Sequence, residues 1–112
     1  MNDRYHNQPP LEVWRLRAEE WADLDAAAHL LADGKSSVFS EWSQELISEG
    51  MAISTAERTV KASERYRDYL KKMNAARKRA NRARVAMDYA KEKLWESKNA
   101  DANARADKRL HA

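Results

Sequence analysis

Glycine and proline are so scarce in this sequence that the chain can make very few turns. Only two glycines and two prolines occur among its 112 residues, and these are the residues that most often interrupt regular structure. β-Branched residues are sparse and never alternate with polar ones, which argues against strands. The length allows at most one domain. The sequence therefore predicts an all-α fold built from long helices.

The first half of the chain reads as one helix. After a polar leader, residues 1–10, apolar residues recur every three or four positions, which is the spacing of one helix face. One glycine costs a helix only about 1 kcal/mol, and the stripe keeps its phase across Gly34. We therefore expect a helix over residues 11–49, with a kink or break at 33–36 left open, followed by a turn at 50–54. The predicted seam residues in it are Trp14, Trp21, Leu24, Leu31 and Trp42.

The second half predicts a short helix and then a long one. Ser54 and Glu57 have the spacing of a capping box, and Ser63 is a second candidate cap. These signals place a short helix at 55–62, a long helix at 63–106 and a frayed tail at 107–112. A heptad register indicates a coiled-coil seam along the long helix. The large predicted seam residues, and the alanine at their centre, are Tyr66, Tyr69, Met73, Ala80, Met87 and Leu94.

Two long helices joined by a turn predict an antiparallel helical hairpin, or coiled coil. A pair of helices buries little apolar surface per residue. We therefore expect a homodimer, in which two hairpins complete a four-helix arrangement.

Charge divides the chain into two halves of opposite sign. Residues 1–57 contain four Lys/Arg and eleven Asp/Glu, a net −7, whereas residues 58–112 contain seventeen and seven, a net +10. Such asymmetry indicates either a basic segment for nucleic acid or two oppositely charged helices that pair. Columns beside a coiled-coil seam normally pair with a neighbouring helix, and about half of the basic charge is expected to be neutralised in this way. The candidate acidic partners are Glu12, Glu19, Glu20, Asp23, Asp25 and Asp33.

The segment "MNAARKRANRAR", residues 73–84, contains five positive charges and no negative one. Basic side chains spaced along a helix can contact successive phosphates without reading sequence, and an acidic protein surface could bind the same side chains. Trp95 lies off the predicted seam, on the helix face of Arg77 and Arg84. It could stack on a base or anchor a protein interface, or be covered by a second chain or by residues 55–62. The candidate binding residues are Lys71, Arg77, Lys78, Arg79, Arg82, Arg84, Lys91 and Trp95.

Catalysis finds little support in the sequence. No glycine-rich phosphate loop, nucleophile motif or paired-carboxylate site is visible, and we expect no enzyme, no cofactor and no small-molecule substrate. The histidines His6, His29 and His111 lack the spacing of a metal face, and there is no cysteine, so no metal site is expected. The polar start and the lack of a long apolar run predict a cytoplasmic protein without a membrane role.

Three stretches resemble small, largely uncharacterised helical proteins encoded by phages and prophages. They are "AERTVKASERYRDYL", "ARKRANRARVAMDY" and "DANARADKRL", and the likeness covers about residues 11–110, being best over 56–110. The resemblance implies a role in replication and recombination or in disarming host defence complexes, by binding rather than by chemistry. It supplies no catalytic residues.

Three hypotheses follow from the sequence. The first is an accessory protein of the phage type, whose basic helix binds nucleic acid or a host or phage protein complex that processes nucleic acid. The second is an inhibitor that docks on a host defence or nuclease complex. The third is a structural coiled coil whose charges pair between its own helices.

Overall fold

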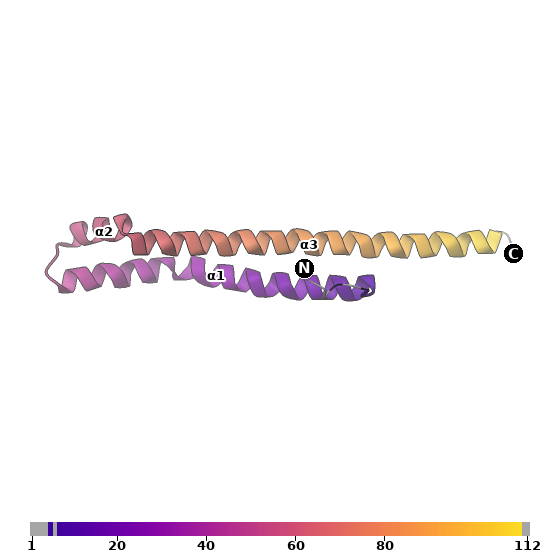
Figure 1. The fold of residues 1–112 in the computed structure, drawn as a ribbon, viewed down its shortest axis with the longest axis horizontal. Helices are drawn as coiled ribbons and strands as arrows, with labels where there is room; N and C mark the ends of the chain where they lie inside the picture. Colours follow the sequence, from indigo (N-terminus) through magenta and orange to yellow (C-terminus); the bar gives the residue numbers. More distant parts are fainter. Residues whose placement is uncertain (1–4, 6, 111–112) are drawn as a thin grey trace. The chain divides into compact units, whose positions relative to one another are not determined.

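A computed structural model describes Tyr5 and residues 7–110, and these residues form three helices and no strand. Helix α1 spans Pro10–Ser48, α2 spans Ile53–Ala62 and α3 spans Glu64–Leu110 (Figure 1). The all-α prediction is confirmed, and the two long helices pack against each other. His6 and His111 lie outside the described residues.

Contacts divide the chain into two compact units. The turn unit is Leu24–Ala80, which contains the end of α1, all of α2 and the start of α3. The terminal unit combines Met1–Asp23 with Asn81–Ala112.

Local backbone chemistry accounts for both ends of α1. Pro10 opens the helix, where its missing N–H costs nothing, and the Val13 amide donates to the Pro9 carbonyl at 3.0 Å. At the other end Gly50 adopts φ +102°, a conformation that glycine tolerates. The Gly50 amide donates to Ile47 and the Met51 amide to Leu46, which is a Schellman cap. Between these ends α1 runs through Gly34 without interruption.

Ser63 separates α2 from α3. Its hydroxyl oxygen accepts a hydrogen bond from the Tyr66 amide at 3.2 Å and donates to the Val60 carbonyl at 2.6 Å, so it caps α3 as predicted. The predicted capping box at Ser54 is wrong, because α2 already begins at Ile53, with Ala52 at the cap position and no side-chain cap bond. At its far end α3 continues to Leu110, whereas the sequence predicted an end at 106.

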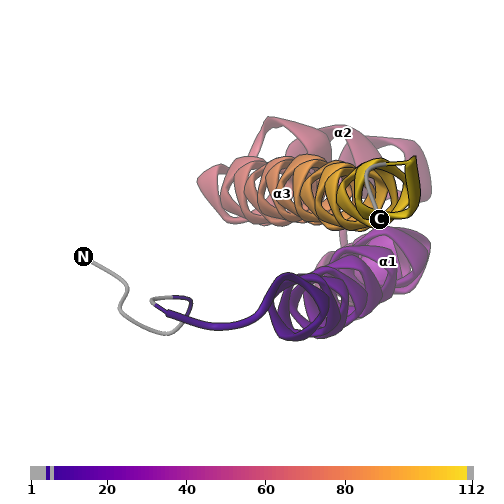
Figure 2. The same ribbon diagram turned by 90° about the vertical axis from the view of Figure 1, so that its right-hand side faces the viewer.

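The turn unit is an antiparallel helix pair, with α1 and α3 side by side in both views (Figures 1 and 2). Its buried cluster is formed by Ala28, Ala76 and Ala80, against which Leu24 and Leu31 pack. Aromatic contacts extend this core toward the turn: Phe39 meets Tyr66 with ring centroids 5.7 Å apart, and Trp42 meets Tyr69 edge-on at 6.2 Å. Small side chains at the centre let the two backbones approach closely.

In the terminal unit, the first turns of α1 lie beside residues 83–94 of α3. The buried side chains here are Ala83, Ala90 and Leu94. From Trp95 to Leu110 every residue of α3 is exposed. This last part of α3 therefore contributes no buried side chain to the unit.

The predicted seam residues of α3 all face inward to some degree. Tyr66, Ala80 and Leu94 are buried, and Tyr69, Met73 and Met87 are half-buried. Those of α1 are covered less well, because none of them is fully buried. Trp14, Trp21, Leu24, Leu31 and Trp42 are each half-buried.

Candidate functional site

The strongest concentration of one charge lies on α3 between Asp68 and Asp88. This stretch has no acidic residue, and all its cations except the half-buried Arg77 are exposed. We call this set of cations the basic run. Its members in the turn unit are Lys71, Lys72, Arg77, Lys78 and Arg79. Its members in the terminal unit are Arg82 and Arg84.

Only two ion pairs among the described residues join α3 to α1. Arg65 meets Glu45 at 3.1 Å, and Arg77 meets Asp25 at 2.8 Å. The Arg77 guanidinium donates to the Asp25 carboxylate and holds the pKa of that carboxyl below its ordinary value, with His29 at 3.3 Å assisting. Arg77, a predicted binding residue, is therefore engaged in helix pairing.

Within the part of the chain that the structure describes, the other acidic side chains of α1 form ion pairs in their own helix or none. Arg15 binds both Glu12 and Glu19, and the pKa of Glu12 is lowered chiefly by the hydrogen bond from Arg15. Glu20 meets Arg17 at 3.6 Å. Residues three or four positions apart are neighbours on any helix, so these acids pair with cations of α1 rather than with cations of α3. The expectation that these acids neutralise about half of the basic charge of α3 is therefore wrong.

Six members of the basic run have no ion-pair partner among the described residues. Three of them crowd one another, because Lys78 and Arg82 are four residues apart and Arg79 and Arg82 are three apart, and like charges at these spacings repel. Their helix positions place Lys71, Lys78 and Arg82 opposite the buried alanines of α3. The unpaired cations are Lys71, Lys72, Lys78, Arg79, Arg82 and Arg84.

The last two predicted binding residues lie further along α3, in the terminal unit. Lys91 is exposed without an ion pair among the described residues, and Trp95 is 57% exposed. The Lys98 ammonium lies 5.7 Å from the centre of the Trp95 ring. Helical spacing puts Arg84, Lys91 and Trp95 on one side of α3, a different side from Lys78 and Arg82. The predicted residues thus occupy two sides of the helix.

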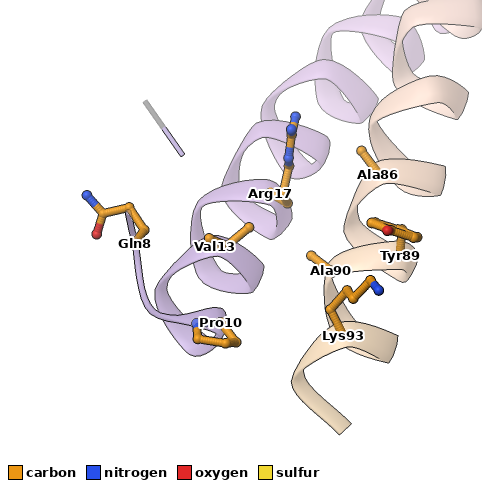
Figure 3. A pocket seen from close by; sticks show the side chains of 8 residues that line it. All are labelled: Gln8, Pro10, Val13, Arg17, Ala86, Tyr89, Ala90 and Lys93. Carbon is orange, nitrogen blue, oxygen red and sulfur yellow. The ribbon is translucent and has the colours of Figure 1, made fainter. Parts of the chain in front are cut away.

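A groove in the terminal unit was missed by sequence reasoning. Its volume is about 320 Å³, and Val13 and Arg17 on α1 face Ala86 and Ala90 on α3 across it, with Tyr89 and Lys93 on the α3 wall (Figure 3). Gln8 and Pro10 complete the lining. The available signal was the spacing of Ala86, Tyr89, Ala90 and Lys93, which share one side of a helix.

The two cations of the groove already have carboxylate partners. The Arg17 guanidinium lies 3.7 Å from the centre of the Tyr5 ring, and the Tyr5 hydroxyl donates to Glu20, the residue that Arg17 also meets. The Lys93 ammonium lies 3.5 Å from Glu96 and 5.4 Å from the Tyr89 ring centre. Glu96 first, and then Tyr89, raise the pKa of Lys93. The groove is thus largely apolar with balanced charge at its edges.

The part of the chain that the structure describes contains neither a candidate metal site nor a helix that could span a membrane. No group of three His, Asp or Glu side chains within Tyr5 and residues 7–110 could hold a metal ion. None of the three helices combines the length and apolar character needed to cross a membrane.

Comparison with known proteins finds no matching family model, no similar curated protein and no similar solved structure.

Proposed function

We propose that this protein is a non-enzymatic accessory protein of the phage type that binds nucleic acid through the basic run of α3. The observation that supports this most directly is the set of six exposed cations that have no carboxylate partner within the described part of the chain. Because Lys78, Arg79 and Arg82 repel one another, a phosphate backbone placed beside them would relieve repulsion as well as add attraction. Such contacts supply affinity without reading base sequence.

The strength of the interaction should depend steeply on salt. A protein that neutralises about five phosphates releases their condensed counterions, so the logarithm of its affinity falls with the logarithm of salt concentration at a slope near −4 to −5. The basic run contains enough unpaired cations for such a slope. Fluorescence anisotropy with labelled single- and double-stranded DNA, from low to physiological salt, measures it directly.

Charge reversal at the centre of the basic run tests the assignment. In the triple variant Lys78→Glu, Arg79→Glu, Arg82→Glu, we expect DNA binding to be lost while the helix content measured by circular dichroism is retained. These side chains are exposed, so the fold does not depend on their packing.

The matched control reverses three cations at the exposed end of α3. The variant Arg105→Glu, Lys108→Glu, Arg109→Glu makes the same change in net charge outside the basic run and should weaken binding much less. Equal losses in the two variants would show that net charge alone attracts DNA. Unchanged binding in the first variant would overturn the proposal and favour an acidic protein partner.

We also propose that two copies associate, completing a four-helix arrangement in the cytoplasm. The supporting observation is a shallow apolar depression on α1, in the terminal unit, whose apolar lining is Leu11, Trp14, Ala18 and Ala22. Leu11 is 58% exposed there. A second copy would bury this surface, which the chain's own helices leave uncovered.

A further inference from the structure

We propose that the groove of the terminal unit binds bases of single-stranded nucleic acid, with Tyr89 as the stacking platform. The inference rests on the proposed function and deepens it, because it names the strand type and the residue that would contact the bases. It is independent of the side of α3 that displays Trp95.

The lining of the groove suits the flat, apolar face of a ligand. Val13, Ala86 and Ala90 place methyl groups on its two walls, and Tyr89 adds an aromatic ring that is 60% exposed. Every base has a π-face, so stacking on an aromatic side chain is tolerant of sequence. Small side chains beside an exposed ring leave room for a base to lie against that ring.

Cations flank the ring along the same helix. Arg82 precedes Tyr89 by two helical turns, about 10 Å along the axis, and Lys93 follows it by one turn. Arg82 has no ion-pair partner among the described residues, whereas Lys93 forms an ion pair with Glu96. Attraction for the phosphates would therefore come chiefly from Arg82, on the side of Tyr89 that leads to the basic run. Alternation of cationic and aromatic groups is the pattern used for single strands.

A duplex would not bind in this groove through its bases. Its bases already stack on one another and present only their edges, whereas the faces of unpaired bases are free for aromatic side chains. A duplex could still contact the cations of the basic run through its phosphates. Binding in the groove thus requires a base whose face is accessible.

The test compares two substitutions of Tyr89 on three DNA probes. The probes are a labelled oligothymidylate, an abasic strand of the same length and a duplex. Tyr89→Leu should weaken oligothymidylate binding about fivefold or more, the loss of one stacked base, and should leave abasic and duplex binding unchanged. Tyr89→Phe keeps the ring and should retain full affinity. Because Tyr89 is exposed, circular dichroism should show the same helix content in each variant.

Several outcomes would overturn the inference while the proposed function stands. One is equal affinity of the wild-type protein for the abasic strand and oligothymidylate. Another is an unchanged affinity in Tyr89→Leu, or a loss that appears in Trp95→Leu instead, which would move the platform to the other side of α3. If the wild-type protein binds none of the three probes, both the inference and the proposed function fail.

Discussion

Gly34 is a close-approach position within the turn unit. A Cβ atom added there would lie 3.2 Å from the Tyr69 hydroxyl oxygen, which is tighter than ordinary van der Waals contact. The Tyr69 hydroxyl cannot withdraw freely, because it donates a hydrogen bond to the Leu31 carbonyl at 2.5 Å. The glycine therefore serves the contact between α1 and α3, and α1 passes through it as a continuous helix.

This contact makes the effect of Gly34→Ala depend on residue 69. Alanine favours a helix interior over glycine by about 1 kcal/mol, but in the wild-type background the crowding of Tyr69 should offset that gain. In the Tyr69→Phe background the hydroxyl is absent, and Gly34→Ala should raise the free energy of unfolding by about 1 kcal/mol. Urea unfolding of the four proteins, followed by circular dichroism, measures both effects. An equal gain in both backgrounds would refute the crowding.

At the scale of the elements, local signals predicted most of the fold. Gly50 and Ser63 mark the breaks because each acts on its own backbone neighbours. The prediction at Ser54 failed because α2 starts at Ile53, two residues earlier than predicted, so the Ser54 side chain lies inside the first turn instead of at the cap. Pairing across helices was harder to predict, since the rotation of α1 about its axis decides whether Asp25 faces α3.

The candidate site, like the fold, was predictable from the sequence only where it depends on residues close together in the chain. The basic run is visible in the sequence because its members lie close together in one helix. Whether those cations are free depended on acids of α1. The spacing that lets Glu12 and Glu19 bind Arg15 was visible in the sequence, but which acids of α1 would reach α3 was set by the pairing of the two helices. The groove joins Val13 to Ala90, two residues far apart in the chain, and only the pairing register of the helices reveals it.

Unpaired cations along α3 should make the stability of the protein rise with salt. Repulsion between like charges within one helix is screened by added ions, and residues 7–110 contain only two ion pairs between α1 and α3 that salt could weaken. We expect the thermal midpoint to increase when sodium chloride is raised from about 10 mM to 0.15 M, a range over which the screening length shortens several-fold. A midpoint that falls steeply instead would support the structural coiled coil, in which ion pairs hold the helices together.

At the scale of the whole molecule, the core explains why a second copy is expected. The buried apolar residues are mostly alanines, and each alanine contributes little to the hydrophobic stabilisation. The large side chains Trp14, Trp21 and Trp42 remain half-buried. Association would bury more of this area and add the stabilisation that the alanines do not supply.

The proposed dimer gives a direct expectation for sedimentation equilibrium. One chain has a mass of 12.9 kDa, and the wild-type protein should sediment with about twice that mass. Ala18→Glu adds a charge to the depression on α1, which Glu12, Arg15 and Glu19 also line, and should shift the protein to the monomer, since burying a further charge is costly. Lys108→Glu, at the exposed end of α3, is the control and should remain a dimer. A wild-type monomer at high concentration would contradict the association.

The exposed end of α3 has a thermodynamic consequence. Residues 95–110 bury no side chain, whereas most of the stability of helices in proteins comes from tertiary packing. The helical state of this segment is therefore sustained by its continuity with the packed part of α3, and it opens at low free-energy cost, as fraying termini do. A ligand that contacts this segment must supply the entropy of ordering it. Amide hydrogen exchange in residues 95–110 thus reports occupancy of this end of the helix even when no contact elsewhere changes.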